Sequence, residues 1–241
     1  MKKLTILIDM DDTIENLVDV WIEFLNKKHG TNVHRDDVIK WDISEAFPSL
    51  SLGDIYAPLS SEELWETVTT LPGAVENMQR LISDGHKLVI VTASHQDTVP
   101  LKLNNVLFKY FPFITMDDVI IAKQKQLING DILIDDAPHN LEGGSYKGIL
   151  MSAPHNKSYN AQANGFIRAN NWDEIYAAIY QIAQDLSDRI AQNSSDRIHA
   201  RWEFRGGSGQ CSNCHMWFND VCDVGYVDEY CRHCGAKMDE V

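Results

Sequence analysis

Cysteine is absent from the first 210 residues of this 241-residue chain, and all five cysteines follow that point. A secreted protein stabilised by disulfides would have cysteines along most of its length. We therefore expect a reducing compartment, the cytoplasm. No apolar run approaches the roughly 18 residues that a membrane-spanning helix needs, so we expect no membrane partner. Basic residues are scarce, 21 against 35 acidic ones, and the net charge of −14 argues against general attraction to nucleic acid.

Short apolar runs alternate with helical patterns up to about residue 190. The runs predict five buried parallel strands at residues 4–8, 87–91, 119–122, 132–134 and 148–152. Helical patterns lie between them, such as PGAVENMQRLISDG, in which Pro72 suits the first turn and Gly85 the end of a helix. A final long helix is predicted over NNWDEIYAAIYQIAQDLSDRIAQ. This alternation predicts an α/β fold with a parallel sheet.

Residues 14–70 interrupt the alternation. Apolar residues follow helical spacing at its start, namely at Ile14, Leu17, Val18, Trp21 and Leu25. Ser60 and Glu63 have the spacing of a capping box ahead of a further helix. We therefore predict a helical insertion after the first strand.

The stretch LTILIDMDDT, residues 4–13, places three carboxylates directly after the first predicted strand. Asp9 lies at the carboxyl end of that strand, where open parallel sheets bind ligands. Asp11 can project toward the same space, and carboxylates this close repel each other unless a cation or a shared proton relieves them. We expect the cation to be Mg²⁺. Asp and Thr also cap helices at such turns, so these residues alone leave a structural role open.

Polar residues also follow the second predicted strand. KLVIVTAS places Thr92 and Ser94 at the same edge of the sheet as Asp9. A hydroxyl and free backbone amides at that edge can hold a phosphate oxygen. Thr and Ser also end strands for purely local reasons, so this signal is weak by itself.

The fourth predicted strand, within NGDILIDDAPHN, ends in the adjacent carboxylates Asp135 and Asp136. Such a pair after an apolar strand is costly unless a metal or a hydrogen-bond network offsets it. Lys125, with Lys123 nearby, precedes this strand. A lysine there could neutralise a phosphoryl oxygen, although a surface position is commoner for either one.

In chain order, DMDDT, VTAS, KQLINGD and DILIDD resemble the four motifs of the haloacid dehalogenase-like (HAD) phosphohydrolase superfamily, over residues 1 to about 185. IDMDDTIENL, LPGAVENMQRL, VIVTASH and GDILIDDAPHNL are most similar to 5′(3′)-deoxyribonucleotidases of the cytosolic and mitochondrial type. The resemblance implies a Rossmann-like core and a Mg²⁺-dependent phosphomonoesterase whose substrate is a (deoxy)ribonucleoside monophosphate.

The resemblance also implies roles for the motif residues. Asp9 would be the nucleophile that forms an aspartyl-phosphate, and Asp11 would protonate the leaving alcohol and then activate water. The phosphoryl oxygens would be held by Thr92, Ala93, Ser94 and Lys125. The Mg²⁺ ligands would be the carboxylate of Asp9, the backbone carbonyl of Asp11, and Asp135 or Asp136.

The implied domain organisation is a HAD core of residues 1–13 and 71–195, with a helical cap at 14–70 that selects the nucleoside. Many relatives have Gly where this chain has Asp12, and an aromatic residue where it has Leu17. The aromatic residues left to stack on a base are Trp21, Phe24, Trp41, Phe47 and Trp65. We expect most of them to belong to the core of the cap.

Residues 196–241 form a separate linker and zinc ribbon in this interpretation. CSNC and CRHC are two CxxC pairs separated by sixteen residues, a spacing typical of one tetrahedral structural zinc site. Its ligands would be Cys211, Cys214, Cys231 and Cys234. Four thiolates leave no position for water or substrate, so the zinc would stabilise a segment too short to bury a sufficient core. Cys222 would be a free buried thiol; two disulfides are the alternative.

The segment 196–241 carries five Lys or Arg against eight Asp or Glu, so we expect no nucleic-acid partner for the ribbon. Contact with another protein, or with a second copy of the chain as a homodimer, is the role we expect. Two other functions stay open. One is a HAD phosphatase acting on a nucleic-acid 3′ end or a sugar phosphate. The other is a partner-binding protein in which the ribbon carries the main role.

Overall fold

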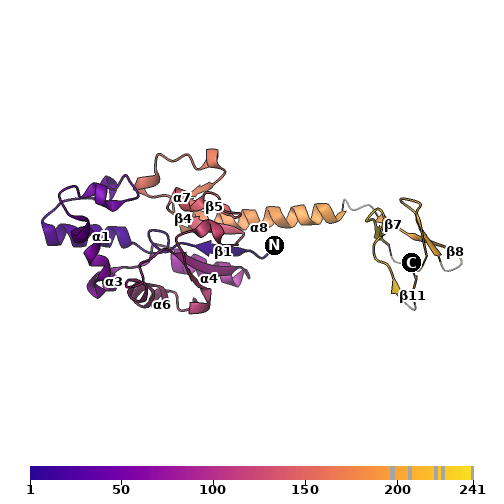
Figure 1. Cartoon of the computed structure of the whole chain (residues 1–241), viewed down its shortest axis with the longest axis horizontal. Coiled ribbons are helices and arrows are strands. Elements are labelled where there is room, and N and C mark those ends of the chain that lie inside the picture. Colours follow the sequence, from indigo (N-terminus) through magenta and orange to yellow (C-terminus); the bar gives the residue numbers. More distant parts are fainter. Residues whose placement is uncertain (196–198, 206–207, 220–221, 224–225, 240–241) are drawn as a thin grey trace. The chain divides into compact units, whose positions relative to one another are not determined.

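The computed structural model describes residues 1–195, 199–205, 208–219, 222–223 and 226–239. The chain divides into two compact units, Met1–Ala183 and Gln184–Val241. The boundary lies inside the long helix α8 (Trp172–Ser195), whereas we predicted it near residue 195, where this helix ends (Figure 1). None of the helices in the described ranges is both long and apolar enough to cross a membrane.

A six-stranded parallel sheet forms the centre of the first unit, in the order β3-β2-β1-β4-β5-β6. Its strands are β1 (Thr5–Ile8), β2 (Lys87–Thr92), β3 (Val119–Ile121), β4 (Ile132–Asp135), β5 (Lys147–Met151) and β6 (Ile167–Ala169). The five predicted strands are confirmed, each end within one residue of the prediction. The sixth, β6, escaped prediction because Arg168 breaks its three-residue apolar signal.

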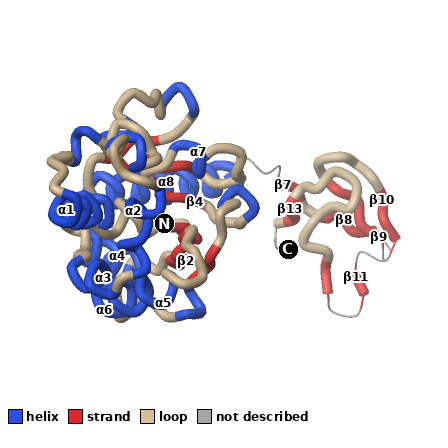
Figure 2. The backbone as a smooth tube through the Cα atoms, turned by 60° about the vertical axis from the view of Figure 1, so that its left-hand side comes forward, coloured by secondary structure: helices blue, strands red, loops and turns tan. Residues whose placement is uncertain are grey.

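Helices surround the strands of this unit (Figure 2). They are α4 (Ala74–Ser83), α5 (Val99–Lys102), the π-helical turn η4 (Leu103–Leu107), α6 (Phe108–Tyr110), η5 (Met116–Asp118), η6 (Lys125–Leu127), α7 (Pro138–Leu141), η7 (Pro154–Asn156), η8 (Gln162–Asn164) and α8. Gly85 ends α4 as predicted, with a left-handed φ of 85° that glycine adopts without steric cost. Pro72 lies in the turn before α4 and not in its first turn.

The insertion after β1 is helical, as predicted. Its elements are α1 (Leu17–His29), η1 (Arg35–Asp37), η2 (Ile43–Ala46), α2 (Leu52–Tyr56), η3 (Ala57–Ser60) and α3 (Glu62–Thr67). Figure 1 shows α1 and α3 side by side, beyond the end of β1 that is opposite the N-terminus. The insertion has its own apolar cluster, in which Phe47 and Trp65 are buried. The predicted capping box at Ser60 is wrong: Ser60 ends η3, and Ser61 precedes α3 without a side-chain capping bond.

The second unit consists of the end of α8 and short strands. They are β7 (His199–Ala200), β8 (Trp202–Arg205), β9 (Ser208–Cys211), β10 (Trp217–Asn219), β11 (Cys222–Asp223), β12 (Tyr226–Val227) and β13 (Lys237–Met238). Its described buried hydrophobic residues are Ala200, Trp202, Cys211, Cys231, Ala236 and Met238. So small an apolar core is typical of domains that need a further stabilising element.

Candidate active site

The turn after β1 places Asp9 beside the end of β4. The Asp9 N–H donates to the carbonyl of Ile134 at 2.9 Å, and the amides of Thr13 and Ile14 donate to the carbonyl of Met10. Asp9 is buried, with 6% of its surface exposed. Because β1 and β4 are neighbouring parallel strands, their carboxyl ends bring separate carboxylates to one edge of the sheet.

Lys125 joins two of these carboxylates. Its Nζ donates to Asp9 Oδ1 and to Asp135 Oδ2, the latter at 2.6 Å, and its side chain is 1% exposed. Burial opposes its charge, but Asp9 and Asp135 together raise the pKa of Lys125. Lys123 is exposed, so of the two lysines considered from the sequence Lys125 is the one buried against these carboxylates.

Burial raises the pKa of Asp9 to about 7, with Asp135 and Asp11 adding to the rise and Lys125 opposing it. Carboxylate oxygens of Asp9, Asp135 and Asp136 lie within 4.8 Å of one another. Hard oxygen ligands at this spacing suit Mg²⁺, and a divalent cation would offset the charge that burial penalises. The residues present therefore fit the metal that the sequence implies.

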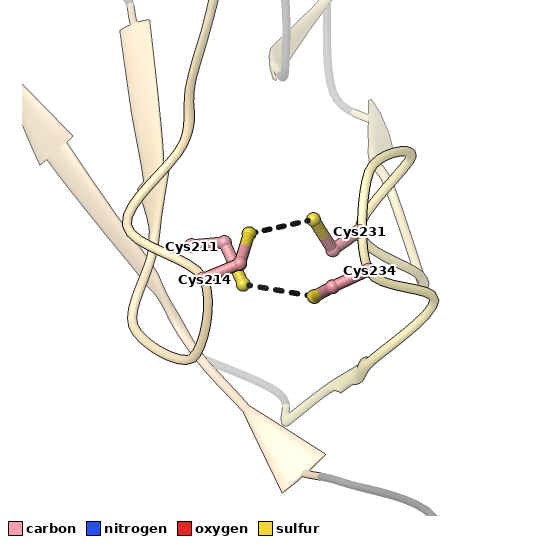
Figure 3. A group of neighbouring side chains, drawn as sticks. All are labelled: Cys211, Cys214, Cys231 and Cys234. Carbon is pink, nitrogen blue, oxygen red and sulfur yellow. Dashed lines mark hydrogen bonds between the residues drawn. The ribbon is translucent and has the colours of Figure 1, made fainter.

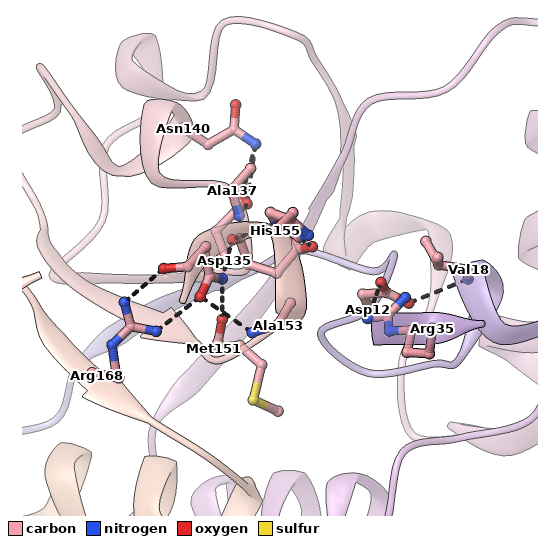
Figure 4. A network of polar contacts seen from close by, with 12 residues as sticks. Asp12, Val18, Arg35, Asp135, Ala137, Asn140, Met151, Ala153, His155 and Arg168 are labelled. Atoms are coloured by element: carbon pink, nitrogen blue, oxygen red, sulfur yellow. Dashed lines mark hydrogen bonds and ion pairs between the residues drawn. The ribbon is translucent and has the colours of Figure 1, made fainter. Parts of the chain in front are cut away.

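The adjacent residues Asp135 and Asp136 differ in their hydrogen-bond partners. Asp135 accepts from Lys125. It also accepts from the Ala137 N–H at 2.9 Å and from Asn140 Nδ2 at 3.1 Å (Figure 4). Asp136 lines the cavity described below, and its Oδ2 lies 3.4 Å from His155 Nε2. Burial and the negative charge of Asp135 raise the pKa of Asp136 well above its usual value. Asp136 therefore presents to the cavity a carboxylate that a bound cation would stabilise.

Lys102, in α5, is a site residue that the sequence analysis missed. Its side chain is 1% exposed, and its Nζ lies 2.6 Å from Asp11 Oδ1 and 2.7 Å from Thr92 Oγ1. Ser94 Oγ lies at 3.4 Å. Burial of Asp11 acts in the opposite direction, but Lys102 lowers the pKa of Asp11 overall. In the sequence, Lys102 is marked only as the single lysine within the largely apolar stretch VPLKLNNVL.

Glu15 is a second residue that the analysis did not single out. It is fully buried, and an isolated bridge pairs its backbone with that of Asp11. Burial, and then the negative charge of Asp11, raise the pKa of Glu15 well above its usual value. Burial and the neighbouring Asp11 thus both favour the protonated form of this carboxyl.

Asp12 has a left-handed φ of 51°. Its carboxylate is buried, accepts from the Val18 N–H at 3.2 Å and lies 2.6 Å from Arg35 Nη2 (Figure 4). Burial raises the pKa of Asp12 to about 6, and Arg35 opposes that rise. Because Arg35 belongs to η1 of the insertion, the ion pair ties the insertion to the turn after β1.

A cavity of about 250 Å³ lies between the strand ends and the insertion. Its core side includes Asp9, Asp11, Ala93, Lys125 and Asp136, and its insertion side includes Leu17, Trp21, Trp41, Asp42 and Tyr56. Of the five aromatic candidates, Trp21 and Trp41 therefore line the cavity, whereas Phe24, Phe47 and Trp65 are not part of its lining. Thr92 and Ser94 are not part of it either, and both contact Lys102.

The second unit brings the four cysteines of its two CxxC pairs together (Figure 3). The sulfurs of Cys211 and Cys234 are 3.8 Å apart, and those of Cys214 and Cys231 are 3.6 Å apart. All four are free thiols, so the disulfide alternative is wrong. A tetrahedral Zn²⁺ with bonds of about 2.3 Å to sulfur separates its ligands by about 3.8 Å, which fits this cluster. The side chain of Cys222 lies outside the described residues.

Known proteins match the first unit. The family model described as 5′ nucleotidase, deoxy (pyrimidine), cytosolic type C protein matches residues 2–186. A 5′(3′)-deoxyribonucleotidase from Bacillus subtilis strain 168 is 34% identical over 176 residues, covering 73% of this chain and 97% of that protein. One from Clostridium acetobutylicum is 33% identical over 177 residues, covering 73% and 95%. The family match ends before the cysteine-containing segment.

Solved structures show the same fold. A haloacid dehalogenase-like family hydrolase from Streptococcus pneumoniae aligns with a TM-score of 0.54 at 13% identity, covering 73% of this chain and 98% of that chain. A haloacid dehalogenase-like protein of unknown function from Agrobacterium tumefaciens aligns with a TM-score of 0.51 at 14% identity, covering 76% and 100%.

The buried ion pair gives a first prediction. Arg35→Ala leaves the Asp12 carboxylate buried without its cation, so the free energy of unfolding should fall by about 1–3 kcal/mol. Adding Asp12→Gly removes the buried charge and suits the left-handed φ, so urea unfolding should find the double variant more stable than Arg35→Ala alone.

The matched control is Lys157→Ala, which removes an exposed ion pair to Asp36 of the same η1 segment and should cost about 0–0.5 kcal/mol. A double variant less stable than Arg35→Ala would contradict the role given to Asp12.

The cysteine cluster gives a second prediction. Cys231→Ser should reduce bound zinc from one ion per chain to none, measured by atomic emission on the purified protein, because three thiolates hold a structural ion weakly. Amide hydrogen exchange should then become fast in the second unit and stay unchanged in the first. Cys222→Ser is the control and should keep its zinc; loss of zinc in that variant would show that the ligand set is different.

Proposed function

Because the chain belongs to the family of cytosolic type C deoxy (pyrimidine) 5′ nucleotidases, we propose that it is a Mg²⁺-dependent phosphatase that hydrolyses deoxyribonucleoside monophosphates. The family match and the sequence identities with 5′(3′)-deoxyribonucleotidases confirm the resemblance that the sequence motifs indicated. The observation that carries the proposal is the cavity, which has carboxylates and Lys125 at one end and apolar and aromatic side chains at the other. A phosphate ester of a nucleoside has the same division into a charged and an apolar end.

In the first step, a carboxylate oxygen of Asp9 attacks phosphorus, and the bond between phosphorus and the ester oxygen breaks. The product is an aspartyl-phosphate on Asp9. Asp11 donates its proton to the departing oxygen, which leaves as the nucleoside hydroxyl. Asp9 is suited to this role because its backbone is fixed by β4 and its carboxylate is held by Lys125.

In the second step, Asp11 takes a proton from water as the water oxygen attacks phosphorus. The bond between Asp9 and phosphorus breaks, inorganic phosphate leaves, and both aspartates return to their starting states. One residue can act first as an acid and then as a base because the second step reverses its proton transfer.

The cation would be held by the carboxylates of Asp9 and Asp136 and by the backbone carbonyl of Asp11. When bound, Mg²⁺ would screen the negative substrate from the carboxylate nucleophile and polarise the phosphoryl oxygens. Asp135 would act indirectly, because its oxygens already accept from Lys125, Ala137 and Asn140.

Lys102 gives Asp11 a means of changing its proton affinity. Without substrate, Lys102 pairs with Asp11 and lowers the pKa of that carboxyl. A phosphate dianion near Thr92 would compete for the same ammonium group, which lies 2.7 Å from the Thr92 hydroxyl. Asp11 would then lose part of its cationic partner and bind a proton more readily, as an acid must.

The domain organisation is part of the same proposal. The HAD core would comprise residues 1–13 and 71–195, and the helical insertion at 14–70 would serve as the cap that selects the nucleoside. The zinc ribbon would add stability or bind a protein partner, a role that the family match does not include because it ends at residue 186.

Substitution of Asp9 tests the mechanism. Asp9→Asn keeps the shape of the side chain but removes the nucleophile, so phosphate release from a panel of deoxyribonucleoside and ribonucleoside monophosphates should fall to background. Wild type should release phosphate from the deoxyribonucleotides only when Mg²⁺ is supplied. Asp117→Asn, at an exposed position in η5, is the control. Retained turnover in Asp9→Asn would refute the mechanism.

Lys102 makes a further prediction. Lys102→Met preserves the length of a buried side chain while removing its charge, so folding should persist and kcat/KM should fall about 10²- to 10³-fold. Lys123→Met, at an exposed position nearby, should leave kcat/KM unchanged. Equal activity in the two variants would exclude Lys102 from the phosphate site.

A further inference from the structure

Asp136 lies just past the end of its strand. In the ladder between β4 and β5, Asp135 pairs with Leu150, and Asp136 is the next residue along the chain. The carboxylate of Asp136 lines the cavity and lies 3.4 Å from His155 Nε2, which is longer than a good hydrogen bond. Strand pairing alone therefore does not fix where this carboxylate points.

Two adjacent residues of η7, the turn after β5, reach the backbone carbonyl of Asp136. Asn156 Nδ2 donates to this oxygen at 2.7 Å, and His155 Nε2 lies 3.1 Å from it. The same Asn156 amino group also donates to the carbonyl of Met151 at 2.7 Å. Because Met151 is the last residue of β5, Asn156 joins the end of that strand to the residue that follows β4.

The side-chain amide of Asn156 fits its surroundings in one orientation. Its Oδ1 accepts from the Ala153 N–H at 3.2 Å and from Arg168 Nη1 at 2.8 Å (Figure 4). Two carbonyls face its Nδ2, so reversing the amide would set oxygen against oxygen and N–H against N–H. Asn156 is 1% exposed, so it makes these hydrogen bonds with the protein and not with bulk water.

Arg168, in β6, holds Asn156 from the other side. Its Nη2 donates to the carbonyls of Asn156 at 3.0 Å and of Tyr159 at 2.7 Å, and its Nη1 lies 3.3 Å from Ser152 Oγ. The acceptors described for this guanidinium are thus uncharged oxygens. A planar fork of N–H donors fixes the geometry of its acceptors more strictly than a single ammonium would. The contacts from Arg168 through Asn156 to Asp136 therefore connect an edge strand of the sheet with the cavity.

We infer that Asn156, oriented by Arg168, is a positioning residue that holds Asp136 where its carboxylate can bind a divalent cation. The inference rests on the proposed function, because it takes Asp136 to be a ligand of that cation. Mg²⁺ requires nearly ideal octahedral geometry, so a ligand that is free to shift binds it less well. Removal of a group that orients a metal ligand typically costs about 10- to 100-fold in metal affinity.

Metal binding in the absence of substrate tests the inference. The probe is Mn²⁺, which carboxylate sites bind as they bind Mg²⁺ and whose free concentration electron paramagnetic resonance measures directly. The full-length protein is first loaded with zinc, and Asp136→Asn identifies the Mn²⁺ that is bound at this site. In Asn156→Ala, the Kd for that Mn²⁺ should rise about 10- to 100-fold above the wild-type value.

Asn77 offers the matched control. It is 2% exposed, its Nδ2 donates to the carbonyl of Gly73 at 3.0 Å and its Oδ1 accepts from Arg80 at 2.9 Å, but it belongs to α4 and does not line the cavity. Asn77→Ala should lower the melting temperature much as Asn156→Ala does and leave the Kd for Mn²⁺ unchanged. An equal rise in Kd in both variants would show that lost stability is responsible, and would overturn the inference.

Asn156→Asp serves if the alanine variant does not fold. It keeps an acceptor for Ala153 and Arg168 and can pair with the Arg168 charge, but it has no donor for the Asp136 carbonyl. The added negative charge by itself would strengthen the binding of a cation, so a rise in Kd has to come from the lost donor. We expect such a rise, and a Kd equal to that of wild type would overturn the inference.

The binding measurement also separates this inference from the proposed function. A rise in Kd in Asn156→Ala supports the role of Asn156 even if wild type hydrolyses no nucleotide. An unchanged Kd refutes that role even if hydrolysis proceeds with Mg²⁺. The inference would equally fail if Asp136→Asn removed no bound Mn²⁺ from the protein, since Asp136 would then not be a ligand.

Discussion

Compensation of buried negative charge at the carboxyl edge of the sheet is the constraint on which the rest of this structure depends. Five carboxylates gather there, those of Asp9, Asp11, Asp12, Asp135 and Asp136. Each buried carboxylate without a partner would cost several kcal/mol, roughly, or would bind a proton instead. Lys125 joins Asp9 to Asp135, and Lys102 holds Asp11. Asp136 is left with no lysine among the contacts described, which is why this edge suits a divalent cation.

The same charges explain why the site suits phosphate chemistry. Both lysines are buried and held by carboxylates, so their ammonium groups are fixed before a substrate arrives and lose little freedom on binding it. The insertion places mostly apolar side chains opposite this edge, and such surroundings strengthen electrostatic interactions relative to those in water. Arg35 and Asp12 join the insertion to the turn that carries Asp9 and Asp11. Closure of the cavity and placement of the nucleophile are therefore parts of one arrangement.

Much of the fold could be predicted because central parallel strands are buried on both faces and read as continuous apolar runs. The strand β6 could not, since it is short and contains Arg168. At the site, Asp9 and Asp136 come together, as their strand ends predict, and Lys125 of η6 lies against Asp9. Lys102 could not be found in this way, because nothing local marks one lysine as buried: its environment is set by β2 and the turn after β1. The pairing of Asp12 with Arg35 is likewise a contact between segments, invisible to periodicity.

The most direct test of the account is to look for phosphate on Asp9 during turnover. Enzyme mixed with a radiolabelled deoxyribonucleoside monophosphate and Mg²⁺ is quenched in acid within the first turnover, and the protein is digested and mapped. The account predicts a transient, hydroxylamine-sensitive label on the peptide that contains Asp9, because acyl phosphates react with hydroxylamine. Release of labelled phosphate without any label on the protein, or with the label on another residue, would contradict it.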